Sequence, residues 1–251
     1  MDSDETGSPF TRPAFLISAG LVVVLAAAAI VLGLTRHHGS DDNARPAAIP
    51  TATSSGPASP VRSGTSARSD ESVCGLASGA GPETVASPPA VNWKFQGTTA
   101  YPTSPTVGPG KTAEAGYRYC FQHSAAGALL FAANAVAQNT DDAQGRAWYK
   151  YAFSSGGPYE AEVLSQAPKP GELDAVQRVS IAGYRLLSYD DTAAAVDLAV
   201  RITTGNKTTL TSSTSQLRWH DGDWKFSTDV AKPGDAAVIP DLTGYTAWGE
   251  S

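Results

Sequence analysis

Hydrophobic residues are distributed unevenly along the chain, and the longest run of them lies near the N-terminus. Residues 14–34 form an unbroken stretch with no charged side chain. A helix rises about 1.5 Å per residue, so this stretch would span roughly 32 Å and could cross the hydrocarbon core of a bilayer. It is longer than the apolar part of a cleaved signal peptide, and no small-residue cleavage pattern follows it. The pattern therefore predicts a retained transmembrane helix at residues 14–34.

The predicted helix implies a topology for the rest of the chain. Basic residues do not orient it, because Arg12 precedes it while Arg36 and Arg45 follow it. A short tail ahead of the helix and a long segment after it are typical of a signal-anchor. We expect a single-pass protein of the cell membrane, with residues 1–13 in the cytoplasm, residues 14–34 in the lipid bilayer and the C-terminal part outside the cytoplasm.

Small and polar residues dominate the next segment, residues 35–72. The segment includes 8 Ser, 6 Ala, 4 Thr, 4 Pro and 3 Gly, and Ile49 and Val61 are its only large apolar residues. Such a composition buries too little apolar surface to offset the entropy that is lost on ordering. The segment is therefore predicted to be a disordered linker, and a flexible coil of this length spans roughly 35 Å.

The remaining residues, 73–251, are predicted to form one domain. They hold nearly all of the chain's aromatic residues, which is enough to build a core. Alternating apolar and polar positions from Val91 to Phe95 predict a short strand. The Pro- and Gly-rich residues 101–110 indicate an extended, irregular stretch.

Three helices are predicted in the first half of this domain. Ser124 suits the N-cap of a helix over residues 125–138, whose apolar positions recur three and four residues apart. That helix has no charged residue, so we expect it to be largely buried. Asp141 with Asp142 is predicted to begin a second helix, and Pro158 to lie in the first turn of a third.

The period of the pattern changes to two in the second half of the domain, which predicts four strands joined as hairpins. The turns are predicted at Asp190–Asp191, Gly205–Asn206 and Asp221–Gly222. The residues predicted to share one face are Val179, Ile181, Gly183, Arg185 and Leu187 in the first strand, and Val196, Leu198, Val200 and Ile202 in the second. Helices followed by such a meander indicate an α+β domain, with about three helices packed on a curved four-stranded antiparallel sheet.

The two cysteines of the chain, Cys74 and Cys120, are its candidate site residues. They lie far apart in the sequence, a spacing that gives neither a CxxC redox motif nor a zinc site. They therefore form one disulfide or remain two reduced thiols. Disulfides persist outside the cytoplasm, so the predicted membrane anchor favours the bridge. No catalytic, metal or cofactor site is predicted.

The charge balance argues against nucleic acid as a partner. Residues 73–251 hold 13 of the chain's 18 Lys and Arg and 17 of its 24 Asp and Glu, a net charge of −4. No basic patch is visible in this part, whereas binding to phosphates needs a concentration of basic side chains.

The titratable residues form no catalytic grouping that the sequence reveals. His123 lies just before a helix, where a neutral imidazole usually caps or packs, and His220 lies in a turn and is expected to be solvated. Asp197 and Arg201 share one strand face, where two opposite charges are usually an exposed pair. Because no acid, base and nucleophile come together, we expect the domain not to be an enzyme.

Several motifs carry a resemblance to known proteins. The order of elements and the hairpin at residues 217–225 resemble the cone-shaped α+β fold of the nuclear transport factor 2-like, or cystatin-like, superfamily. The chain also resembles an uncharacterised family of actinobacterial single-pass membrane proteins, in Trp93 and residues 74–76, 102–105, 108–110, 120–124 and 127–130. Membrane-tethered domains of this fold include scaffold subunits of type IV secretion and conjugation machines, to which the chain is distantly similar.

These features predict a membrane-anchored extracytoplasmic interaction or scaffold module of the cell envelope, with protein partners there. The resemblance implies a conjugation or secretion assembly as its setting. The alternative is a small-molecule binding or lyase-like domain of the same fold, which a deep apolar cavity lined by His123, Tyr151 or Asp197 would favour. The sequence leaves self-association undetermined.

Overall fold

The computed structural model describes residues 71–79, 84–140, 145–167 and 178–250. In these ranges no helix combines the length and the apolar character that crossing a membrane requires. The predicted tail at residues 1–13, the predicted transmembrane helix at residues 14–34 and nearly all of the predicted linker at residues 35–72 lie outside the described residues. These three expectations stay predictions.

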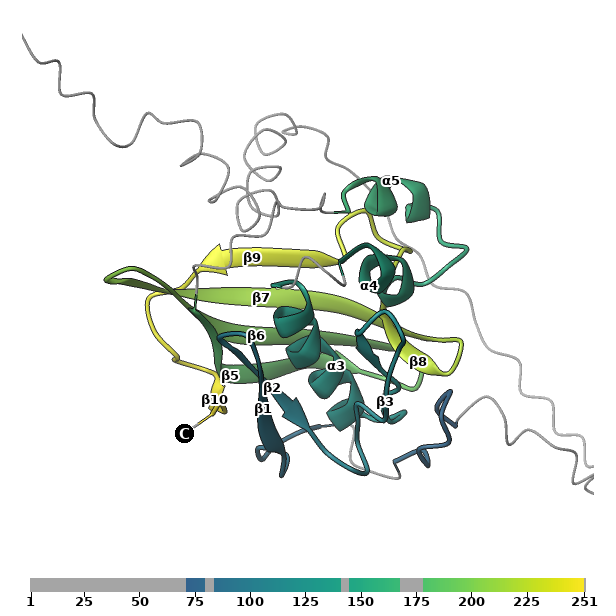
Figure 1. The fold of residues 1–251 in the computed structure, drawn as a ribbon, viewed down its shortest axis with the longest axis horizontal. Helices are drawn as coiled ribbons and strands as arrows, with labels where there is room; N and C mark the ends of the chain where they lie inside the picture. Colours follow the sequence, from purple (N-terminus) through teal and green to yellow (C-terminus); the bar gives the residue numbers. More distant parts are fainter. Residues whose placement is uncertain (1–70, 80–83, 141–144, 168–177, 251) are drawn as a thin grey trace, which may run out of the picture.

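The described chain is mostly β-structure. Two short hairpins come first, formed by β1 (Asn92–Gln96) with β2 (Thr99–Thr103) and by β3 (Lys111–Thr112) with β4 (Arg118–Tyr119). Three helices follow, α3 (Ala125–Gln138), α4 (Gly145–Ala152) and α5 (Glu160–Ser165). The main sheet (Figure 1) is then formed by β5 (Arg178–Tyr189), β6 (Ala193–Thr204), β7 (Lys207–His220), β8 (Asp223–Phe226), β9 (Gly234–Val238) and β10 (Thr246–Ala247).

The main sheet corrects the predicted fold class. It has six antiparallel strands in the order β10-β5-β6-β7-β8, with β9 also pairing with β7. The prediction of an α+β cone with three helices on a four-stranded sheet is therefore wrong, because the domain is rich in strands and its helices have only 14, 8 and 6 residues. The sequence pattern missed β9 and β10 because a short Gly-Asp-Ala-Ala-Val segment and a Thr-Ala pair carry no clear apolar alternation.

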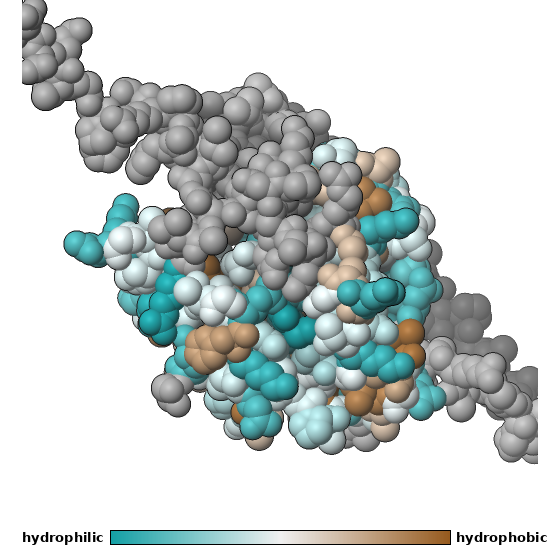
Figure 2. All heavy atoms as spheres, viewed as in Figure 1, coloured by the Kyte–Doolittle hydropathy of each residue, from teal (hydrophilic) through white to brown (hydrophobic). Residues whose placement is uncertain are grey.

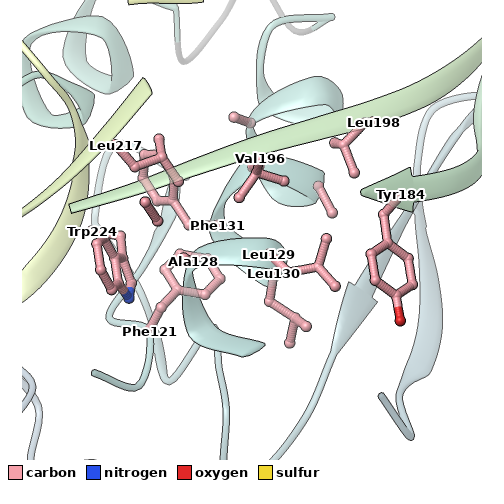
Figure 3. Close-up of a cluster of buried hydrophobic side chains, with 14 of the residues drawn as sticks. Phe121, Ala128, Leu129, Leu130, Phe131, Tyr184, Val196, Leu198, Leu217 and Trp224 are labelled. Carbon is pink, nitrogen blue, oxygen red and sulfur yellow. The ribbon is translucent and has the colours of Figure 1, made fainter. Parts of the chain in front are cut away.

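The longest helix was located correctly by its pattern. Ser124 caps α3, since its Oγ accepts a hydrogen bond from the Gly127 N–H at 3.0 Å. The helix lies across one face of the main sheet and is buried along nearly all of its length, as its lack of charge predicts (Figure 1). Figure 3 shows the core that results, in which Leu129, Leu130 and Phe131 of α3 lie against Val196, Leu198 and Leu217 of the sheet.

The hairpin turn between β7 and β8 is also confirmed. Asp221 and Gly222 have φ angles of 53° and 75°, the left-handed conformations that a type I′ hairpin turn requires at both central positions. Strand register continues through the turn, with Trp219 opposite Trp224 and His220 opposite Asp223. This turn places His220 and Asp221 at one end of the sheet.

One strand face was predicted wrongly in its second half. A β-bulge lies between Ile181 and Gly183 of β5 and shifts the alternation of the strand by one residue. Tyr184 therefore joins Ile181 in the core, whereas Leu187 lies at a second register shift, between Leu186 and Ser188, and is 52% exposed. A bulge of this kind depends on pairing with β6, so the apolar period of β5 alone does not reveal it.

We predict that Gly127→Ala destabilises the domain although alanine is the better helix former. A Cβ at Gly127, in the first turn of α3, would overlap the carbonyl oxygen of Gln122. Displacing this backbone should cost about 2 kcal/mol, which exceeds the roughly 1 kcal/mol gained in helix propensity. Urea unfolding followed by circular dichroism measures the difference. A gain in stability for Gly127→Ala would contradict the prediction.

Candidate functional site

A buried carboxylate joins three parts of the domain. Asp223, the first residue of β8, is fully buried, and each of its oxygens accepts two hydrogen bonds. Oδ2 accepts the Cys120 N–H and the Tyr151 hydroxyl, each at 2.7 Å. Oδ1 accepts the N–H groups of Phe121 at 2.8 Å and Trp224 at 2.9 Å. Because its acceptor sites are used in this way, the carboxylate acts as a structural clamp between β8, α4 and the chain after β4.

Lys225 completes this buried cluster. Its Nζ donates to the backbone carbonyl of Tyr151 at 2.8 Å and lies over the Tyr151 ring, 2.9 Å from the centroid. Burial lowers the pKa of Lys225 to about 8, although the nearby Asp223 carboxylate favours the charged form. Burial also raises the pKa of Tyr151, and the adjacent Asp223 raises it further. The hydroxyl of Tyr151 therefore keeps its proton and donates a hydrogen bond to Asp223.

We predict that Lys225 makes the domain more stable as the pH rises from 7 to 10. Its pKa is about 8 in the folded protein against an ordinary value of 10.5, so the unfolded chain binds more protons in this range. The free energy of unfolding contributed by this group therefore rises with pH, by about 2 kcal/mol, since one pKa unit corresponds to about 1.4 kcal/mol.

The comparison that isolates this effect is with Lys225→Met, which keeps the apolar length of the side chain and has no charge to lose. Urea unfolding at pH 7 and pH 10 should show a larger rise for the natural chain than for the variant. The contributions of the tyrosines that do not contact Lys225 are common to both proteins and cancel. Equal pH dependence in the two proteins would contradict the prediction.

The predicted disulfide is present and lies beside the buried cluster. Cys74 and Cys120 are bridged, with an S–S distance of 2.07 Å and Cα atoms 6.1 Å apart. Cys120 has a φ of 69°, in the left-handed region that residues other than glycine rarely adopt. Its backbone N–H donates a hydrogen bond to Asp223 Oδ2. The bridge fastens residues 71–79, the first described part of the chain, to the chain after β4.

An open depression of about 510 Å³ lies between this first segment and the β7–β8 turn. The two parts are joined by a hydrogen bond from the Val73 N–H to the Gly222 carbonyl at 2.7 Å. We call the feature the turn depression, and its lining residues are Glu71, Ser72, Val73, Trp219, His220, Asp221 and Gly222.

A serine and a histidine meet next to the turn depression. Ser155 Oγ lies 2.9 Å from His220 Nε2, and Asp221 Oδ2 lies 3.4 Å from the same nitrogen. In a catalytic triad the carboxylate binds the opposite ring nitrogen and orients the imidazole toward the serine. Here hydroxyl and carboxylate share one nitrogen, so the three side chains form a polar rim rather than a nucleophile activated by a base.

The predicted packing role of His123 is confirmed. Its ring stacks on the indole of Trp219, with the ring centroids 4.0 Å apart and an angle of 4° between the ring planes. Its Nε2 lies 2.6 Å from the carbonyl oxygen of Asp191. His123 therefore supports the indole that lines the turn depression.

The predicted exposure of Asp197 is wrong. Its carboxylate is 1% exposed, forms an ion pair with Arg185, and accepts hydrogen bonds from Ser212 Oγ at 2.7 Å and Tyr245 Oη at 2.8 Å. Tyr245 belongs to the C-terminal segment, which returns to the edge of β5 and brings its hydroxyl to Asp197. Arg201, by contrast, is exposed as expected.

These placements bear on the alternative function, a small-molecule binding or lyase-like domain with a cavity lined by His123, Tyr151 or Asp197. His123, Tyr151 and Asp197 are used in three separate packing or hydrogen-bonding contacts, and none of them lines the turn depression. In the described part of the chain, no three His, Cys, Asp or Glu side chains are grouped so that they could hold a metal ion. Sequence reasoning missed Asp223, and the only signal was its position directly after an Asp-Gly turn.

Comparison with known proteins identifies the family of the chain. A family model described as Domain of unknown function (DUF8175) matches residues 52–247. No curated protein and no solved structure matches the chain significantly. The family match begins inside the predicted linker, well before Cys74, so the unit shared by the family starts ahead of the described domain.

Proposed function

We propose that this chain, which belongs to the family described as Domain of unknown function (DUF8175), is an extracytoplasmic interaction module of the cell envelope. Residues 14–34 anchor it in the membrane, and its C-terminal domain contacts a protein partner. The observation that carries the proposal is the turn depression, an open surface held in place by the disulfide Cys74–Cys120.

The disulfide supports the extracytoplasmic location. Reducing conditions keep thiols of cytoplasmic proteins in the reduced state, whereas bridges form and persist outside the cytoplasm. Both cysteines of the chain are used in this bridge. An extracytoplasmic location of the C-terminal domain is consistent with the topology predicted for residues 14–34.

The use of the polar side chains supports binding rather than catalysis. Asp223, Asp197 and His123 are buried and engaged in contacts that hold the domain together. The side chains that the turn depression presents to solvent are of another kind, with Val73 54% exposed and the Asp221 side chain 78% exposed. Aromatic side chains are enriched at surfaces that recognise other proteins, and polar side chains lie at the rims of such surfaces.

Exposed apolar side chains elsewhere on the described chain are scattered. On the face shown in Figure 2, hydrophobic atoms form small, separate groups among hydrophilic ones. The large exposed apolar residues of the described chain come from different parts of the sequence, namely Val73, Phe95, Tyr159, Leu187, Val230 and Val238. The turn depression is therefore the surface on which the proposal depends.

Photo-crosslinking in intact cells tests the proposal. A benzophenone residue at Val73 should give a covalent adduct with an envelope protein on irradiation, because this position lines the turn depression. The matched control is Phe95, which is exposed to a similar degree, 59%, but lies on β1. Absence of an adduct at Val73, or the same adducts from both positions, would contradict the proposed contact surface.

Protease treatment of intact cells tests the proposed location. We expect the C-terminal domain to be cleaved without lysis of the cells, while a cytoplasmic marker protein stays intact. Cleavage that occurs only after lysis would place the domain on the other side of the membrane and refute the proposal.

A further inference from the structure

We infer that two copies of this chain associate through the outer edge of β9, which pairs with β9 of the second copy in antiparallel orientation. This inference goes beyond the proposed function and does not depend on the turn depression, because no residue of β9 belongs to the lining of that depression. Three features of β9 carry it: the direction of its backbone groups, the absence of edge protection, and the symmetry of its residues.

The backbone of β9 bonds to β7 at every second residue. The Ile239 N–H donates to the Leu210 carbonyl at 3.0 Å, and the Gln216 N–H donates to the Pro233 carbonyl at 2.7 Å. Since these groups alternate in direction along a strand, the odd-numbered residues of this segment face β7. The N–H and C=O groups of the residues between them point away from β7, namely those of Gly234, Ala236 and Val238.

The outer side of β9 is an open sheet edge, whereas other segments bond to the outer sides of β5 and β8. β10 pairs with β5, and the Ser154 N–H donates to the Phe226 carbonyl of β8 at 2.9 Å. Among the described residues, no strand pairs with the outer side of β9, which lies at the edge of the sheet beside β7 in Figure 1. β9 contains no lysine or proline and pairs with β7 without a bulge, so it lacks these common protections of an edge.

The outward-facing residues of β9 are symmetric about Ala236, which favours a second copy of the same strand as the occupant. About a twofold axis at Ala236, this residue lies opposite its own copy, and Gly234 lies opposite Val238 of the second copy. Every outward N–H and C=O group of β9 is then paired. A register shifted toward Pro240 leaves a carbonyl unpaired, because proline has no N–H to donate.

The side chains fit the same arrangement. Val238 is 74% exposed, the largest exposed fraction among the large apolar residues of the described chain. In the pair it lies directly opposite Gly234 of the second copy, which has no side chain to exclude it, so both valines lose exposed surface. On the other face of β9, Asp235 is neutralised within its own copy by Lys232, with Nζ and Oδ1 2.7 Å apart.

The expected association is weak and concentration-dependent. One pair of strands of five residues each buries less surface than the roughly 1,600 Å² of a standard stable interface. A test that traps the pair covalently is therefore more sensitive than one that separates the copies during the measurement.

Cysteine crosslinking of the oxidised, full-length chain tests the inference. At the twofold axis the Cα atoms of the two Ala236 residues should lie about 5.5 Å apart, within reach of a disulfide. Ala236→Cys should therefore form a covalent dimer on mild copper-catalysed oxidation, seen on a non-reducing gel. Peptide mass spectrometry locates the new bridge and checks that Cys74 and Cys120 stay bonded to each other.

Two further variants test the register. Gly234→Cys alone and Val238→Cys alone should not form dimers, because each position is displaced from its own copy by roughly 13 Å along the strand. A mixture of these two variants should form the covalent dimer at least about fivefold more efficiently than either variant alone, because the two positions lie opposite each other.

Phe95→Cys is the matched control for random collision, since Phe95 is 59% exposed and lies on β1. Adding Ala236→Pro to both chains of the mixture should reduce its crosslinking at least about fivefold, because proline removes the outward N–H and leaves the bonds to β7 in place. Circular dichroism checks that the fold is kept. The inference would be overturned by a yield from Ala236→Cys no higher than from Phe95→Cys, by equal yields from Val238→Cys alone and the mixture, or by an unchanged yield with Ala236→Pro in the folded protein.

The outcome is separable from that of the proposed function. If these crosslinks form while position 73 captures no envelope protein, the dimer stands and the proposed function fails. If position 73 captures a partner while Ala236→Cys gives no dimer above the control, the proposed function stands and this inference fails.

Discussion

Replacing both Cys74 and Cys120 with alanine should lower the free energy of unfolding by about 4 kcal/mol, because the bridge closes a long loop in the unfolded chain. The sequence separation of the two cysteines is 46, and the chain-entropy relation for a loop of this length gives about this value. Loss of the bridge should destabilise residues 71–79 most strongly, because the bridge connects this segment to the chain after β4. The turn depression has one wall in this segment and should be disturbed as well.

Urea unfolding of the oxidised chain, the reduced chain and the double variant measures this effect. Reduction should shift the natural chain toward the variant, whereas the same reductant should leave the variant unchanged. An unfolding midpoint that does not change when the bridge is removed would show that the remaining contacts of residues 71–79 are sufficient without it.

Asp223→Ala should be comparably destabilising, by about 4 kcal/mol, because it removes one partner of a buried, hydrogen-bonded charge cluster. Without the carboxylate, the buried N–H groups of Cys120 and Phe121 and the hydroxyl of Tyr151 lose their acceptor. The buried Lys225 also loses the nearby opposite charge. Breaking such a cluster typically costs roughly 3–5 kcal/mol, so a loss in this range is expected.

Tyr151→Phe is the matched control for Asp223→Ala. It removes one of the hydrogen bonds to the carboxylate and leaves the backbone donors paired, so it should cost only about 1 kcal/mol. Urea unfolding of the two variants gives both values. A cost for Asp223→Ala no larger than that for Tyr151→Phe would mean that the backbone contacts of Asp223 contribute little.

Sequence patterns succeeded for features that depend on neighbouring residues. The bounds of α3 followed from its capping serine and its charge-free apolar positions, and the hairpin at Asp221–Gly222 from the turn chemistry of this pair. The core face of β6 followed from simple alternation. Each of these features is decided within a few residues along the chain.

The number of strands could not be predicted in the same way. The short strands β9 and β10 exist because β7 and β5 offer them hydrogen-bonding edges, not because their own residues favour extended structure. The two register shifts in β5 likewise depend on its pairing with β6, and the second of them lies at Leu187, which is exposed rather than on the predicted face.

By itself the sequence determined the helix α3, the β5 to β8 meander and the pair of cysteines available for a bridge, because local periodicity, turn residues and composition are sufficient for these. Only the tertiary structure decided that Asp223 and Asp197 are buried and that the turn depression exists. Asp223 meets Cys120 across 103 positions and Asp197 meets Tyr245 across 48. Whether a charged side chain is solvated or enclosed depends on such distant partners, which the local pattern around it does not contain.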